Sequence, residues 1–391
     1  MLTLLLLGCT GEPTAPPTAV DLSPLPLSWL LDGQLDLDAL RVGIDWNLGL
    51  LGALPPSDGS HLELEEADGL VSGSLDLAAA GFPPGAHAAL TDALAELRAS
   101  DELSGTGAVD LGRLFMLTLH EPWYYYAIAG ACGSFADWRA LRLPAEPDRY
   151  DIVVSLLAAG DRIVLLPPAE TPVAEVAFGI GTDTIAFGEG WSPTEFEVID
   201  FMENGQQRFA AYDEQGRPEP HADPQVVPAG PPGRCQWCHE GNLMVGTPKN
   251  SSTDQAMSYA EWEARMVAWQ ADLEAWRVGL DTSIVYADRE SHTQGERVVR
   301  DFLLPTLVRA AAEWGLPEDE ARALALEEGL WLGQDEEWAS RGEVLLRAEV
   351  DAVLEARSGL PRLSVLSDAR EPAEEEEYRG QEWADWLRCG E

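Results

Sequence analysis

The residues best suited to chemistry form one short stretch, Arg234-Cys235-Gln236-Trp237-Cys238-His239-Glu240. Cys235 and Cys238 are three residues apart, so on a helical turn they lie on the same side. Both thiols can then reach the same ligand. His239 follows directly, and a neutral imidazole is a common metal ligand. Covalent attachment of a cofactor, metal binding and thiol redox chemistry all use such a set of side chains.

Chance is a weak explanation for the spacing C-x-x-C-H. With 5 Cys and 6 His in 391 residues, random placement gives on the order of 0.001 such matches. The motif resembles the haem attachment site of c-type cytochromes, in which the two cysteines bond to the vinyl groups of one porphyrin. The resemblance implies a haem c cofactor with its iron, held by Cys235 and Cys238, with His239 as the proximal iron ligand.

Two other uses of the motif fit less well. A closed zinc site needs four ligands, and the sequence has no second C-x-x-C and no H-x₃-H. A thioredoxin-like thiol pair lies between a strand and a helix of a βαβ unit, whereas here a predicted hairpin and the Pro/Gly-rich loop 228–234 precede the motif. In small cytochromes c a helix precedes the motif, so the resemblance implies haem chemistry without the cytochrome c fold.

The sixth iron ligand has two leading candidates. His292 precedes a predicted helix, and Met257 lies off the apolar face of another, so either could turn towards the iron. Met244 is too close to His239 to cross to the other side of the haem, and Met266 belongs to the apolar helix face. An open sixth position is the alternative, and it would allow small-ligand binding or enzymatic chemistry.

The first residues, MLTLLLLGC, predict export. Leu6-Leu7-Gly8-Cys9 resembles a bacterial lipoprotein lipobox, in which the cysteine becomes the lipid-modified first residue. A Pro- and Thr-rich stretch follows and is typical of an extended tether. We therefore expect a signal and tether over 1–20 and a lipid anchor at Cys9, facing the periplasm or cell surface. The alternative is a frayed apolar terminus with a chance cysteine.

Two cysteines remain once Cys9, Cys235 and Cys238 have been assigned. In an oxidising compartment Cys132 and Cys389 could form a disulfide, although spacing in the sequence does not give their distance in space.

The charge balance is strongly acidic. Asp and Glu total 68 against 25 Lys and Arg, a formal net charge of −43, and Lys249 is the only lysine. Such a surface repels phosphate backbones, which argues against nucleic-acid binding. It would attract a redox partner protein with a basic patch. The alternative is that the acidic residues provide solubility or suit a salty habitat. No run of 18 or more apolar residues appears, so we expect contact with the membrane through the lipid anchor only.

The elements predict an α+β fold. Over 21–220 we expect a mixed domain with a helix at 86–100, a break at Pro122 and a β-rich centre that includes a hairpin at 196–213. In that hairpin Asn204-Gly205 is typical of a type I′ turn. Over 221–391 we expect a mainly helical haem domain.

The helices of this second domain carry recognisable signals. One apolar stripe has the helical spacing of core packing; its members are Tyr259, Trp262, Met266, Trp269, Leu273, Trp276 and Leu280. Ser252 with Gln255 could be its capping box, and Thr293 with Glu296 that of a helix at 294–314. Further helices are expected near 317–333 and 338–357.

Together these features predict an exported haem protein that carries electrons at the cell envelope, rather than an enzyme. Two alternatives stay open. One is a haem enzyme or small-ligand sensor with an open iron site. The other is a surface binding lipoprotein in which the haem is accessory. No catalytic residue is singled out, because the sequence has no G-x-S-x-G, phosphate loop, H-E-x-x-H or dinucleotide fingerprint.

Overall fold

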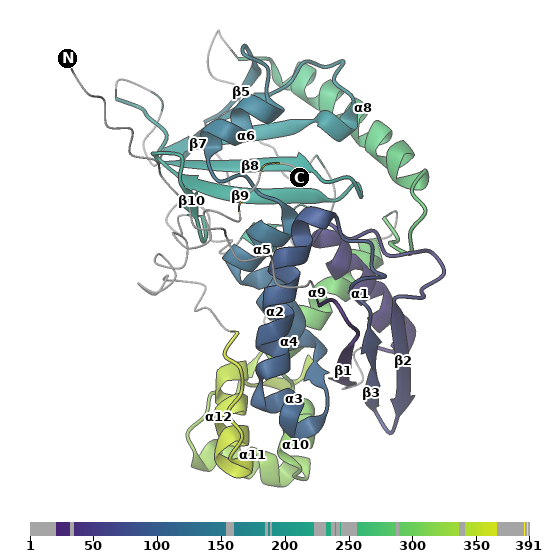
Figure 1. Ribbon diagram of the computed structural model, residues 1–391. Helices are drawn as coiled ribbons and strands as arrows, with labels where there is room; N and C mark the ends of the chain where they lie inside the picture. The colour runs from purple at the N-terminus through teal and green to yellow at the C-terminus, as the bar shows by residue number, and fades with distance from the viewer. Residues whose placement is uncertain are drawn as a thin grey trace, which may run out of the picture.

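The computed structural model confirms the α+β class (Figure 1). It describes residues 21–31, 35–153, 160–183, 187, 190–222, 232–235, 239, 243, 256–286, 289–335, 341–365, 387 and 389. Figure 1 shows a large sheet at the top, a smaller sheet at the lower right and a group of helices at the bottom.

The large sheet is the predicted β-rich centre. Its six strands are antiparallel neighbours in chain order, from β10 at one edge to β5 at the other. They are β5 (Asp148–Ile152), β6 (Asp161–Leu166), β7 (Ala177–Asp183), β8 (Glu195–Phe201), β9 (Gln207–Asp213) and β10 (Pro218–Glu219). Short connections produce this meander, and the 3-10 turn η3 (Val173–Glu175) lies before β7.

Helices cover both faces of the large sheet. On one face, here called the α8 face, Trp262 of α8 (Tyr259–Val278) stacks on Tyr150 with ring centroids 4.6 Å apart. On the opposite face, Phe135 of α6 (Phe135–Arg142) stacks on Phe196 at 4.2 Å. Because side chains alternate along a strand, each strand contributes to both layers.

The apolar stripe of α8 is core, as predicted. Its most buried members are Trp262, Met266, Trp269 and Leu273, which pack into one cluster with the α8 face of the sheet. The helix begins at Tyr259, and its capping box joins Ser258 and Glu261. The capping box predicted at Ser252 and Gln255 is therefore wrong, because the helix begins later, after Ser258.

The β8–β9 hairpin is confirmed, but its predicted turn type is wrong. Gly205 has φ of +77°, whereas Asn204 is not among the residues of positive φ, so the turn is not type I′. Instead, the Gly205 N–H donates to Met202 O, and a three-residue loop closes the hairpin. The reason lies outside the hairpin: the buried Asn204 amide donates to Gly49 O and Ala53 O at 2.7 and 2.6 Å.

A four-stranded sheet lies in the N-terminal part. Its order is β2-β3-β1-β4, with β4 parallel to β1 and the other pairs antiparallel. Its elements and the adjoining helix are β1 (Leu25–Leu30), α1 (Leu37–Leu50), β2 (Leu62–Ala67), β3 (Leu70–Leu75) and β4 (Val109–Asp110). Asp68 and Gly69, at φ of 53° and 79°, form the two-residue turn between β2 and β3.

Short helices connect the two sheets. They are η1 (Pro84–Ala86), α2 (His87–Ala99), α3 (Asp101–Thr106), α4 (Leu111–Phe115), the π-helical η2 (Met116–His120) and α5 (Pro122–Ala129). The helix predicted at 86–100 is therefore confirmed, and Pro122 starts a new helix as expected from its fixed φ and missing N–H.

The C-terminal helices return to the N-terminal part. α9 (Arg289–Leu303) packs along α1, where Asn47 Nδ2 donates to Gly295 O at 3.0 Å. The helix predicted at 294–314 is in fact two helices, because Pro305 interrupts it and Thr306 caps the second. Thr293 lies inside α9 and is not its cap. The remaining elements are α10 (Leu307–Trp314), α11 (Glu318–Glu327), β11 (Gly333–Gln334), β12 (Glu343–Val344) and α12 (Arg347–Ser358).

Buried ion pairs hold these C-terminal helices to the N-terminal part. We call this set the arginine–carboxylate chain; in spatial order it consists of Glu102, Arg113, Asp351, Arg347, Glu313, Arg309 and Asp110. Its N–O distances run from 2.5 to 3.2 Å. The guanidinium groups of Arg113 and Arg347 also lie 5.0 and 4.5 Å from the Phe302 ring, so each cation is fully engaged.

Candidate functional site

The turn that leads into the C-x-x-C-H motif is packed tightly against the large sheet. The 3-10 turn η4 (Pro232–Arg234) contacts β9, α5 and η2. At Gly233 a Cβ atom would lie 2.1 Å from Leu119 O, so only glycine fits this approach. Cys235 and His239 are described, whereas Gln236, Trp237 and Cys238 lie outside the described residues.

Cys235 lies at an apolar site. It is half-buried and packs against the hydrophobic cluster between α8 and the sheet. Leu243, which is 8% exposed, belongs to the same cluster. The first cysteine of the motif and a residue after the motif therefore contact one continuous apolar layer.

His239 lies on the same face of the sheet. Its ring centroid is 5.3 Å from that of Phe209 in β9, and Phe209 belongs to the cluster that Cys235 contacts. Burial and the positive charge of Arg162 lower the pKa of His239 to about 4. The imidazole is therefore neutral near pH 7, which is the form that binds a metal.

Two tyrosines of α5 fix the strand beneath His239. β10 pairs only with the end of β9, and along the rest of that outer edge the structure describes no neighbouring strand. The Tyr125 hydroxyl accepts the Phe209 N–H at 3.0 Å, and the Tyr126 hydroxyl accepts the Ala211 N–H at 2.9 Å. These bonds satisfy the backbone donors of the edge and hold Phe209 in position. In the sequence, the only visible signal of this role is the run of three consecutive tyrosines after Pro122.

The two predicted sixth ligands lie in different parts of the core. Met257 packs against the same cluster as Cys235, and its N–H donates to Arg149 O at 2.8 Å. His292 is buried in α9, with its ring edge-on to Trp46 at 5.9 Å. The structure thus places Met257, but not His292, in the apolar layer that the motif contacts.

The structure contains the Cys132–Cys389 disulfide that the sequence left open. Cys132 is buried beside α6, and the Tyr212 hydroxyl of β9 donates to its carbonyl oxygen at 3.0 Å. The bond thus joins the C-terminal segment to the region behind the large sheet. The predicted lipidation site, Cys9, lies outside the described residues.

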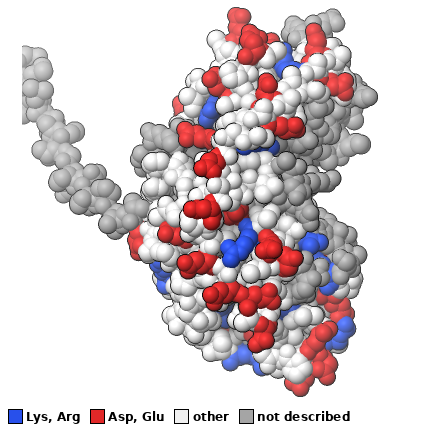
Figure 2. All heavy atoms as spheres, turned by 90° about the vertical axis from the view of Figure 1, so that its right-hand side faces the viewer, with Lys and Arg blue, Asp and Glu red and all other residues white. Residues whose placement is uncertain are grey.

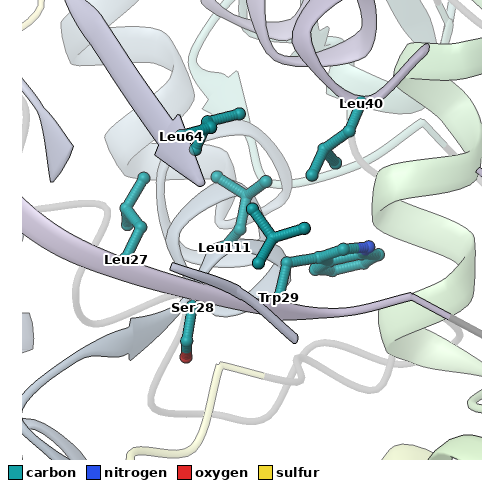
Figure 3. Close-up of a pocket in the computed structure, with 7 residues that line it drawn as sticks. Leu27, Ser28, Trp29, Leu40, Leu64 and Leu111 are labelled. Carbon is teal, nitrogen blue, oxygen red and sulfur yellow. The ribbon is translucent and has the colours of Figure 1, made fainter. Parts of the chain in front are cut away.

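A separate apolar crevice lies in the N-terminal part, between the small sheet and α1 (Figure 3). Leu27, Leu40, Leu64 and Leu111 point into it, and Trp29 closes one side. Its lining is almost wholly apolar, and it is too tight for a water molecule, so it offers neither the polar groups nor the space that a ligand requires.

No protein-family model, curated protein or solved structure matches this chain. In the described part of the chain, no group of three or more His, Cys, Asp and Glu side chains is arranged to hold a metal ion. The described helices include none with the length and apolar character to cross a membrane.

Proposed function

We propose that this chain is a c-type haem protein that transfers electrons at the bacterial cell envelope. Cys235 and Cys238 would hold the haem through thioether bonds, and His239 would be its proximal ligand. One observation carries the proposal: both described residues of the C-x-x-C-H motif lie at one face of the large sheet, against a single apolar layer.

The donors present suit this cofactor. Thiols and a neutral imidazole are what covalent attachment and iron ligation require, and burial keeps His239 in its neutral form. Phe209 and the apolar cluster around Cys235 supply the apolar surroundings in which a porphyrin packs. When bound, the haem would supply a one-electron couple between ferrous and ferric iron. The chain's own part is to ligate, bury and orient it.

Met257 is the sixth ligand that the packing favours. It shares the apolar cluster with Cys235, whereas His292 is engaged with Trp46 between α1 and α9. A protein ligand on both sides of the iron suits electron transfer, because it leaves no coordination position for a substrate.

The disulfide supports export. Disulfides persist mainly in oxidising compartments, and Cys132–Cys389 joins segments far apart in the sequence. Together with the lipobox-like sequence that ends at Cys9, this favours a protein anchored by lipid at the cell envelope.

The surface suits a basic redox partner. The net charge is −43, and Figure 2 shows acidic side chains spread over the face on view, with fewer basic ones among them. Such a surface would attract a partner with a basic patch, and raising the ionic strength would slow their association.

The test is covalent haem content. The protein, exported together with a c-type haem maturation system, should give a haem-stained band that survives denaturation. Cys235→Ala/Cys238→Ala and His239→Ala should lose the band. His87→Ala, at the start of α2, is the matched control and should keep it. A folded wild-type protein without the band, produced beside a loaded control cytochrome, would overturn the proposal.

Carbon monoxide tests the proposed ligation. With Met257 on the iron, the reduced wild-type protein should bind carbon monoxide poorly, and Met257→Ala should bind it readily. His292→Ala should resemble wild type. Ready binding by the wild-type protein would favour the open-site alternative instead.

A further inference from the structure

One arginine of the large sheet has no carboxylate partner among the residues that the structure describes. The strands β5 to β10 contain three arginines, and two are paired: Arg149 with Asp151 at 2.5 Å and Arg208 with Asp200 at 2.9 Å. Arg162 of β6 makes no ion pair with any described residue, and its buried Nε atom has no hydrogen-bond partner. In a chain with 68 acidic residues, such an arginine calls for an explanation.

Arg162 lies on the face that carries the motif. Val164 and Leu166, at alternate positions of β6, belong to the α8-face cluster, so the Arg162 side chain leaves the strand on that face. Its positive charge reaches His239, where it contributes to the lowered pKa of the imidazole. Arg162 and Phe209, on which His239 packs, therefore lie on one face of the sheet.

A second orphaned polar group lies beside Arg162. Thr182 of β7 pairs directly with Arg162 across the two strands, and directly opposed residues project to the same side. Thr182 is 0% exposed, and its Oγ1 has no hydrogen-bond partner. Glu195 is next in the same row, but no ion pair joins it to Arg162. In the described part of the chain, this face thus presents a guanidinium group and a hydroxyl without a hydrogen-bond acceptor, beside the buried carboxylate of Glu195.

We propose that Arg162 binds a propionate carboxylate of the haem attached at Cys235 and Cys238, an assignment that rests on the proposed function. A haem carries two propionates, and a guanidinium group is the side chain that best matches a carboxylate, through two parallel N–H···O bonds. The propionate would satisfy the buried Nε, and the Thr182 hydroxyl is placed to donate a further bond. An arginine in this position would also fix the rotation of the haem about its thioether bonds.

The experiment uses the matured holoprotein as wild type, Arg162→Met, Arg162→Lys and Arg139→Met. Arg139 is exposed in α6, on the opposite face of the sheet. Arg139→Met therefore removes the same charge at a position that does not face the motif. Two readouts are compared at equal haem content: the propionate bending band in resonance Raman spectra, and the midpoint potential.

Arg162→Met should shift the propionate band and lower the midpoint potential, because the lost cation no longer disfavours the extra positive charge of ferric haem. Arg162→Lys should shift the band yet keep a potential near that of wild type, because it retains the charge and loses the forked pairing. Arg139→Met should change neither. If Arg162→Met does not fold, Arg162→Lys alone decides.

If Arg162→Met carries the normal amount of haem and its propionate band is unchanged, the assignment is overturned while the proposed function stands. If Arg162→Met does not fold, the same result in Arg162→Lys has the same meaning. A wild-type protein without covalent haem would overturn both. The two failures are therefore distinguishable.

Discussion

Between α8 and the large sheet the buried contacts are mainly aromatic and aliphatic, with the ion pair Arg265–Asp148 beside them. Between α4, α10 and α12 a chain of buried ion pairs accompanies the apolar contacts. Trp262 is buried by stacking on Tyr150, and its burial depends on no ion pair of its own. Arg347 is equally buried, but only because Glu313 and Asp351 neutralise it. Both regions bury large side chains; in the second, removal of one partner leaves a charge in the interior.

The difference shows where this chain places its few cations. Lys249 is the only lysine, and many of the arginines lie inside the protein: Arg113, Arg208, Arg277, Arg309, Arg341 and Arg347 are buried. A guanidinium group binds two carboxylate oxygens at once, so arginine serves this role better than lysine. Because these arginines lie in the core, few positive charges remain at the surface, which is therefore acidic. Arg162, which forms no ion pair with a described residue, departs from that pattern.

The largest effect is expected in the apolar layer. Trp262→Ala should lower the free energy of unfolding by about 4 kcal/mol, because it removes a buried aromatic side chain and leaves a cavity. The loss should not depend on salt, and Trp262→Phe should lose less. Urea unfolding at low and high ionic strength measures the loss of stability. A strongly salt-dependent loss would contradict the contrast between the apolar layer and the ionic region.

Arg347→Met should cost about 3 kcal/mol, because Glu313 and Asp351 would each lose a buried partner. Arg357→Met is the control: Arg357 is exposed in the last turn of the same helix, and its loss should cost less than about 0.5 kcal/mol. Equal effects in the two variants would show that the arginine–carboxylate chain adds nothing beyond surface charge.

Acid should weaken the ionic region through Glu313. Burial by itself raises the pKa of Glu313, but the charges of Arg347 and Arg309 outweigh burial and lower that pKa to about 2. A folded-state pKa below the ordinary value of 4.5 means that the contribution is complete above that pH and is lost as the pH falls towards 2. Glu313→Gln should be less stable near neutral pH, yet lose less stability on acidification. Glu327→Gln, an exposed control, should keep the wild-type pH profile, and a wild-type profile in Glu313→Gln would refute this role.

The smallest effect should come from the start of α8. Ser258→Ala removes the hydroxyl that accepts the Glu261 N–H, and it should cost about 1 kcal/mol. Ser258→Asp keeps an acceptor there and should retain most of the stability. Thermal unfolding followed by circular dichroism distinguishes the two variants. If both lose the same stability, the cap does not act through this bond.

Local periodicity predicted the elements, because a strand or amphipathic helix repeats its pattern over many residues. The α8 stripe and the β8–β9 hairpin follow from such patterns and are confirmed, and so is the break that proline predicts at Pro122. Turn geometry was less predictable. Asn204-Gly205 has the sequence of a type I′ turn, but the Asn204 amide binds carbonyl groups at the end of α1. Asp68-Gly69 does have the positive φ angles of a type I′ turn, but no turn was predicted there.

The sequence located the motif but not its surroundings. Whether Arg162 faces the motif depends on the strand register of the large sheet, which local sequence does not specify. In the same way, the position of His292 depends on the packing of α9 along α1, and these segments are far apart in the sequence. Buried arginines have the same sequence signature as surface ones, so the arginine–carboxylate chain could not be predicted.

The most direct test of the central claim is the mass of the peptide that contains Cys235, Cys238 and His239, released by digestion of the matured, exported protein. We predict that this peptide carries the mass of one haem with both thiols consumed, while Cys132 and Cys389 stay linked by their disulfide. An unmodified peptide, or one with Cys235 joined to Cys238 in a disulfide, in a folded protein matured beside a loaded control cytochrome, would contradict the account.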